Sequence, residues 1–95
     1  MDIVRIRYSF VGRVQGVGFR YTAYYLAKQL GLTGYVRNES DGSVTMEVQG
    51  NPYDVKSMLQ KIRESRWIRI DSANPRRIPA VPDERSFRVE SGGNY

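Results

Sequence analysis

A glycine-rich segment, residues 12–20, joins a stretch with strand-like alternation to a stretch with helical periodicity. Its three glycines, Gly12, Gly16 and Gly18, permit turns and close backbone approaches that a Cβ would obstruct. At the start of a helix, such a loop can aim several backbone N–H groups at one point, where they and the helix dipole attract an anion. Arg20 lies in or beside that first turn, where the dipole disfavours a cation unless an anion compensates. The segment therefore predicts a phosphate site.

A plain structural interpretation of these glycines stays open. A tight strand-to-helix connection needs no ligand, and short glycine motifs often have no function beyond the turn. Gly18 is followed by Phe19 and Arg20 instead of Lys and Ser or Thr, so the segment is not a nucleotide-binding P-loop. The glycine spacing also differs from that of a dinucleotide-binding motif. We therefore expect no mononucleotide cradle.

The segments on either side of this loop predict a strand and a helix. Residues 3–12 alternate as a half-buried strand does. Its apolar face holds Val4, Ile6, Tyr8 and Phe10, and its polar face holds Arg5, Arg7 and Ser9. Residues 19–30 have helical periodicity, and Gly31 provides the C-terminal stop. The apolar stripe of this helix is Phe19, Ala23, Leu26, Ala27 and Leu30.

The middle of the chain predicts a hairpin and a second helix. Residues 35–39 and 43–49 flank an Asp-Gly pair at Asp41, which is typical of a hairpin turn. Asn51-Pro52 predicts the N-cap and first residue of a helix. The inward stripe of this helix is Val55, Met58, Leu59 and Ile62.

The C-terminal third predicts two strands separated by a loop. Residues 67–73 alternate and predict the fourth strand, whereas three prolines within residues 74–85 predict a loop on the surface. Residues 86–91 can form a short extra C-terminal strand, and residues 92–95 predict a frayed tail.

The order strand, helix, strand, strand, helix, strand predicts an α+β fold, the ferredoxin-like split βαβ sandwich (βαββαβ). In this fold both helices pack on one face of an antiparallel sheet. Right-handed crossovers place the first strand centrally, beside the third. The glycine-rich loop then lies at one end of the sheet, where Asn38, at the end of the second strand, can approach it. We expect a single domain over residues 1–95.

The amino-acid composition excludes several classes of catalytic and binding site and bears on where the protein is located. The chain contains no cysteine and no histidine, which excludes thiolate nucleophiles, disulfides, histidine bases and the usual zinc ligand sets. Its net charge of +5 favours anionic ligands. The longest apolar run, residues 23–27, is too short to span a membrane, and the N-terminus lacks the apolar core of a signal peptide. We therefore expect no membrane association and a cytoplasmic location.

Two segments of the chain resemble the signature of the acylphosphatase family in order and spacing. The first is Gly12-Arg13-Val14-Gln15-Gly16-Val17-Gly18-Phe19-Arg20. The second is Gly34-Tyr35-Val36-Arg37-Asn38, followed by Asp41-Gly42-Ser43-Val44 and Gly50. The resemblance in length and predicted topology covers nearly the whole chain.

The resemblance implies hydrolysis of a carboxyl–phosphate anhydride to a carboxylate and inorganic phosphate, without a metal, another cofactor or a covalent phosphoenzyme. It implies that Asn38 holds the attacking water and that Arg20 and loop amides grip the phosphoryl oxygens. The residues implied to supply these amides are Gln15, Gly16, Val17, Gly18, Phe19 and Arg20. The expected partners are a small acyl phosphate as substrate and inorganic phosphate as product and competitive inhibitor, with no nucleic acid and a monomeric protein.

The expected chemistry agrees with the residues that are present. A carboxylate leaving group, with a conjugate-acid pKa of about 4, departs without a general acid, so histidine is dispensable. Asn38 can orient a water but cannot deprotonate it, so we expect the phosphate of the substrate to accept the proton. Without the paired motif, Asn38 would be interpreted as a turn former. Tyr21, Tyr24 and Tyr25 are expected to coat the first helix, with one of them able to border the site.

Two positions depart from the family pattern. Ser65-Arg66-Trp67 stands where the family often has a Gly-Pro pair, and Phe10 stands where an aliphatic residue is expected. Neither position contributes one of the two proposed functional side chains.

Two other functions stay open. The first is an anion-binding or regulatory domain without turnover, because acylphosphatase-like domains also occur within larger carbamoyl-transfer proteins; the short N-terminus and the tail favour a free-standing protein. The second is an RNA-binding module, which shares the element order and a basic charge. Such modules display aromatic residues on the third strand, whereas residues 44–49 contain none.

Overall fold

The structure is a computed structural model that describes residues 2–91. The predicted tail at residues 92–95 lies outside the described residues. The elements in chain order are β1 (Val4–Arg13), α1 (Phe19–Leu30), β2 (Thr33–Asn38), β3 (Val44–Gly50), α2 (Pro52–Arg63), β4 (Arg69–Ser72), β5 (Arg76–Ile78) and β6 (Phe87–Glu90). Within the described range, none of the helices has the length and apolar character needed to cross a membrane.

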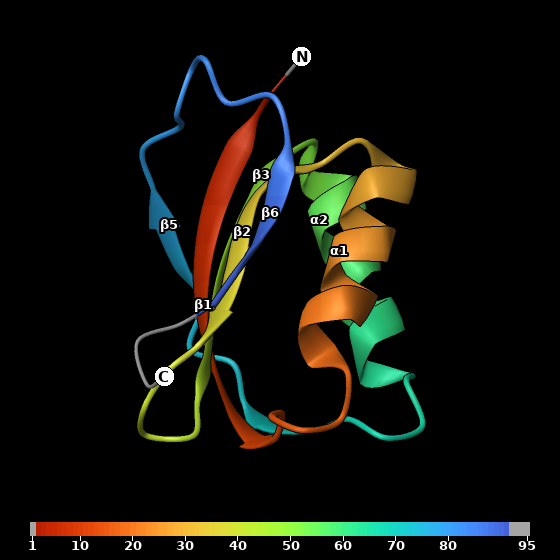
Figure 1. The fold of residues 1–95 in the computed structure, drawn as a ribbon. Helices are drawn as coiled ribbons and strands as arrows, with labels where there is room; N and C mark the ends of the chain where they lie inside the picture. The colour runs from red at the N-terminus through yellow and green to blue at the C-terminus, as the bar shows by residue number, and fades with distance from the viewer. Residues whose placement is uncertain (1, 92–95) are drawn as a thin grey trace.

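The fold has two layers, a sheet and a pair of helices that cover one of its faces (Figure 1). The strand order is β4-β1-β3-β2-β6, and β5 also pairs with β1. Strand β1 therefore lies inside the sheet, with β3 along one edge and the two short strands β4 and β5 along the other. This arrangement confirms the predicted ferredoxin-like α+β fold, the position of the first strand beside the third, and the extra C-terminal strand.

The prediction of a wholly antiparallel sheet is wrong, because β6 runs parallel to β2, with Gly34 opposite Phe87. The segment between β5 and β6 passes over the end of the sheet at which β2 begins (Figure 1). Strand β6 therefore starts beside the start of β2 and runs in the same direction. The sheet is mixed for this reason.

The prediction of a loop throughout residues 74–85 is also wrong, because it contains β5. Strand β5 pairs with β1, with Arg76 opposite Arg7 and Ile78 opposite Arg5. Such pairing uses backbone groups and an available strand edge, so proline-rich flanks did not reveal it. Strand β4 begins at Arg69, two residues later than predicted, because the chain is still turning where the Ile68 amide donates to the Ser65 carbonyl (3.3 Å).

The apolar core lies between the sheet and the two helices. Phe10 is fully buried and packs on Phe19, with ring centroids 4.9 Å apart and planes inclined at 49°. Phe10 thus fills space at the start of α1, which accounts for an aromatic residue where an aliphatic one was expected. The predicted stripe of α2 also faces inward, since Val55, Met58 and Ile62 are buried.

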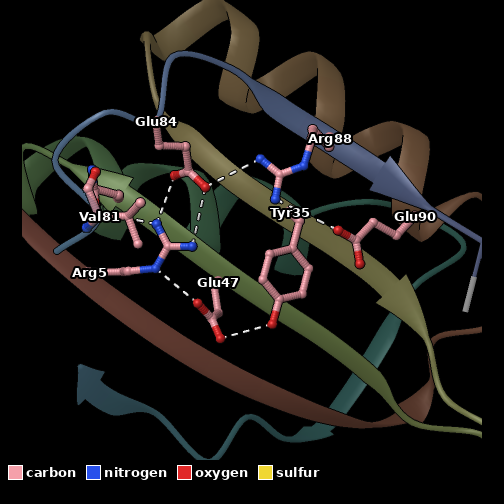
Figure 2. A network of polar contacts seen from close by, with 8 residues as sticks. Arg5, Tyr35, Glu47, Val81, Glu84, Arg88 and Glu90 are labelled. Atoms are coloured by element: carbon pink, nitrogen blue, oxygen red, sulfur yellow. Dashed lines mark hydrogen bonds and ion pairs between the residues drawn. The ribbon is translucent and has the colours of Figure 1, made fainter. Parts of the chain in front are cut away.

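Part of the opposite face of the sheet is covered by a polar network (Figure 2). Arg5, assigned to the polar face of β1, is only 3% exposed because residues 79–86 cross over it. Its Nε donates to Glu47 (2.9 Å) and its Nη1 to Glu84 (2.7 Å). Gln49 ties the same crossing segment down through two hydrogen bonds with the backbone of Val81. A charged network therefore seals this part of the sheet.

The ion pair between Arg5 and Glu84 makes stability depend on pH. Burial alone would raise the pKa of the Glu84 carboxyl, but hydrogen bonds from Arg5 and Thr33 and the charge of Arg5 hold this pKa below its ordinary value. A lowered pKa in the folded state stabilises above the unfolded pKa of about 4.3 and loses this effect as pH falls through the folded pKa. We therefore expect Glu84→Gln to reduce the free energy of unfolding by about 1.5–3 kcal/mol at pH 7.

Urea unfolding of both proteins at pH 7 and pH 3 measures this difference, which should shrink at pH 3, because that pH lies below the unfolded pKa of about 4.3 and the contribution is lost as pH falls toward the lowered folded pKa. The matched control is Asp71→Asn, because the ion pair of Asp71 with Arg69 is exposed on both sides and should contribute less than about 1 kcal/mol. A Glu84→Gln effect that is equally large at both pH values would contradict the assigned role of the ion pair.

Candidate functional site

The structure brings Arg20 and Asn38 to one hollow, although they come from different elements. Arg20 is in the first turn of α1, and Asn38 is the last residue of β2. The hollow has a volume of about 160 Å³. Its lining residues are Val14, Gly16, Gly18, Phe19, Arg20, Tyr21 and Asn38. It lies at the end of the molecule where the β1–α1 loop and the β2–β3 turn meet (Figure 1).

The loop backbone has the left-handed conformation at two glycines. Gly16 has a φ of 73° and Gly18 a φ of 78°. A Cβ at either position would meet no atom within 4 Å, so the backbone conformation, not crowding, favours glycine there. These two residues turn the chain from the end of β1 into α1.

The first turn of α1 leaves its backbone donors available. Gly18 is the N-cap, no side chain caps the helix, and the first turn contains no acidic residue. The Thr22 amide donates to the Gly18 carbonyl (3.0 Å). Across residues 2–91, no backbone hydrogen bond outside the helices and strands is donated by an amide of residues 15–21. Unpaired amides at a helix N-terminus are suited to an anion.

Gln15 braces the loop against the neighbouring turn. Its Nε2 donates to the carbonyls of Glu39 (2.8 Å) and Ser43 (2.9 Å). These bonds connect the loop to the residue that follows Asn38. Gln15 and Val17 are not among the residues that line the hollow. The contributions of the amides of residues 15–20 to phosphate binding all stay predictions.

The guanidinium of Arg20 is oriented by the last strand. Its Nη1 donates to the carbonyl of Glu90 in β6 (2.9 Å). A guanidinium has five N–H donors, so most of them remain for a ligand. Among the described residues, Arg20 takes part in none of the ion pairs. Sequence reasoning missed the contact with Glu90, because only the tertiary arrangement places β6 beside α1.

The β2–β3 turn is closed by Asp41, as the Asp-Gly pair predicted. The Asp41 carboxylate accepts from the Ser43 amide (2.9 Å) and hydroxyl (2.6 Å), and these bonds lower the pKa of Asp41. The pKa of Glu39 is also lowered, first by a hydrogen bond from Thr45 and then by one from Arg37. Both carboxylates are therefore committed to partners within the hairpin.

Tyr21 borders the hollow and is 60% exposed, which agrees with the expectation that one helix tyrosine could do so. Val14, also in the lining, is buried and was not singled out from the sequence. Its place within the glycine-rich motif was the one feature of the sequence that could have indicated its position at the site.

Residues 2–91 contain no group of three or more acidic side chains arranged to hold a metal ion.

Comparisons with known proteins identify the family of the chain. The acylphosphatase family pattern matches residues 6–89. The chain is 39% identical to an acylphosphatase from Clostridium acetobutylicum over 83% of this chain and 88% of that protein. It resembles the crystal structure of the Bacillus subtilis acylphosphatase with a TM-score of 0.84 and 26% identity, over 92% of this chain and 98% of that one.

The chain also resembles part of full-length HypF, whose crystal structure is in a phosphate- and nucleotide-bound form. The TM-score is 0.85 at 28% identity, over 96% of this chain and 12% of that one. The family match over residues 6–89 and the identity to the Clostridium protein extend across most of this chain. The chain therefore belongs to the acylphosphatase family, whose activity is the hydrolysis of acyl phosphates to a carboxylate and inorganic phosphate.

Proposed function

We propose that Arg20 and the amides at the start of α1 hold the phosphoryl group of the substrate while Asn38 places the attacking water. The observation that carries this proposal is the shared hollow, which Arg20 and Asn38 line together with Gly16 and Gly18. The hollow is therefore shared by a cationic residue, a carboxamide residue and the start of α1, and Arg20 forms no ion pair within residues 2–91.

Phosphoryl transfer asks a protein mainly for alignment and for positive potential around the three equatorial oxygens. The guanidinium supplies a planar, permanently charged fork, and its bond to the Glu90 carbonyl restricts its orientation before substrate arrives. The helix amides supply further donors at fixed positions. Preorganised donors of this kind stabilise the developing charge more than mobile water does.

The hydrolysis of the acyl phosphate needs no side chain to act as a base. The water oxygen forms a bond to phosphorus, the bond between phosphorus and the carboxyl oxygen breaks, and the carboxylate leaves with the electron pair. The carboxamide of Asn38 orients the water through hydrogen bonds but cannot take its proton. A phosphoryl oxygen of the substrate accepts that proton. The released phosphate has the charge and shape that the hollow favours, so it should inhibit competitively.

Other functions have weaker support. HypF illustrates that an acylphosphatase-like region can be part of a much longer protein, so binding without turnover is the alternative. Purified, folded protein that fails to hydrolyse benzoyl phosphate would favour it. RNA binding has little support from the third strand. Thr45 and Gln49 are buried there, and Glu47 is bonded to Arg5 and Tyr35, so this strand offers no side chain on which a base could stack. We also propose that the protein is a monomer and that it is located in the cytoplasm. Light scattering tests the first proposal, and cell fractionation tests the second.

Arg20→Ala should weaken both phosphate binding and turnover, because the fork contacts ground state and transition state alike. We expect kcat/KM for benzoyl phosphate to fall by more than about 100-fold, equivalent to about 3 kcal/mol. Steady-state kinetics and the inhibition constant of phosphate measure the two effects.

Arg13→Ala is the matched control for this experiment, because it removes an exposed arginine of the same motif that does not line the hollow. It should change kcat/KM by less than about threefold, which is within the range expected for a surface charge. Equal losses in the two variants would assign the effect to net charge and not to Arg20.

Asn38→Ala should reduce kcat by about 100-fold while leaving phosphate inhibition nearly unchanged, since misplacing a reactant by about 1 Å costs that much. The same kinetic assay separates the two constants, and circular dichroism checks that the hairpin is intact. Near-native kcat would remove Asn38 from the mechanism. A parallel loss of phosphate affinity would instead make it a binding residue.

A further inference from the structure

A second hollow lies on the face of the sheet that the helices do not cover, between β1 and β5. It has a volume of about 370 Å³. Its lining residues are Arg7, Ser9, Asn74, Arg76 and Ile78. We propose that this hollow binds a second oxyanion, an inorganic phosphate ion. It shares no lining residue with the hollow of Arg20 and Asn38.

The two arginines are placed where their charges repel. Arg7 of β1 and Arg76 of β5 are directly opposite in the antiparallel ladder, so their side chains leave the same face of the sheet. Both are exposed, and neither takes part in an ion pair with another residue of the range 2–91. Like charges at directly opposite positions destabilise a sheet unless something neutralises them.

The carboxylate opposite Arg7 on the neighbouring strand β3 forms no ion pair with it among the described residues. Glu47 is opposite Arg7 on the other side of β1. Its Oε1 accepts from the Nε of Arg5 (2.9 Å), and its Oε2 accepts from the hydroxyl of Tyr35 (2.8 Å) (Figure 2). Both oxygens are therefore engaged within the polar network. An anion between Arg7 and Arg76 would meet two guanidinium groups and no available carboxylate oxygen of Glu47.

The break between β4 and β5 creates the hollow and adds neutral donors. The two short strands pair with successive parts of β1, and the chain between them bends at Asn74, which has a φ of 43°. The Ser9 amide donates to the Ala73 carbonyl (3.0 Å), which holds this bend beside β1. Ser9 and Asn74, which carry a hydroxyl and a carboxamide, then line the hollow with the two arginines. Arginine forks and neutral donors together suit a tetrahedral oxyanion.

Amide NMR of the full chain, titrated with phosphate at pH 7.5 against sodium chloride at equal ionic strength, tests the proposal. Wild type should give saturable shifts at two separate groups of amides, residues 15–21 and the residues around Arg7, Ser9 and Asn74. Arg20→Ala should abolish the first group only. Arg76→Gln should weaken binding at the second group at least tenfold, with the first group and the turnover of benzoyl phosphate unchanged.

Arg77→Gln is the matched control. It removes an equally exposed arginine from the same strand, but Arg77 lines a hollow on the helix side of the sheet. This variant should keep both groups of shifts. Shifts around Arg7 that fail to saturate, that sodium chloride reproduces, or that Arg77→Gln weakens as much as Arg76→Gln does would overturn the proposal. Loss of the loop shifts alone would count against the proposed catalytic site and leave this one standing.

Thermal unfolding provides a second readout in the same proteins. Without phosphate, Arg76→Gln should unfold at a higher temperature than wild type because a repulsion is removed. Arg20→Ala, which keeps the second hollow, should still be stabilised by phosphate, whereas the double variant Arg20→Ala/Arg76→Gln should not. If phosphate stabilised the Arg20→Ala variant and the double variant equally, that result would contradict a site between Arg7 and Arg76.

Discussion

The contact between Phe10 and Phe19 fixes the position of β1 relative to the start of α1, and so holds the two elements that the glycine-rich loop connects. Phe10 is fully buried in β1, and Phe19, the first residue of α1, is 2% exposed. Buried aromatic pairs combine a large apolar area with a preferred ring geometry, so they restrict the position of both elements. The site depends on this packing because Arg20 directly follows Phe19. The core therefore determines where the guanidinium begins and where the unpaired helix amides point.

The other face of the sheet contributes through the C-terminal strand. Arg5 and Gln49 hold the segment that leads into β6, the first through Glu84 and the second through Val81. Strand β6 then presents the Glu90 carbonyl to Arg20. A network on the other face of the sheet thus connects to the orientation of Arg20 through one strand. In the acylphosphatase fold of this chain, both faces of the sheet support the same site.

Much of the fold could be predicted because local patterns report on local structure. Alternation identified β1, the Asp-Gly pair identified the hairpin that ends β2, and helical periodicity with glycine stops identified α1. The parallel pairing of β6 and the existence of β5 could not be predicted in this way. Strand pairing at an edge uses backbone groups that every residue except proline possesses, so composition carries little information about it. The burial of Arg5 was missed for the same reason, since a distant segment covers it.

The amino-acid sequence by itself determined the kinds of element, the glycines that permit left-handed turns, the excess of cationic side chains and the two residues proposed for catalysis. Only the tertiary structure decided that the end of β2 and the start of α1 share one hollow, and that Arg20 bonds to a carbonyl 70 residues away. It also decided that Arg7 and Arg76 stand opposite each other. These facts depend on which strand edges meet, and that choice follows from packing the whole core and not from any local pattern.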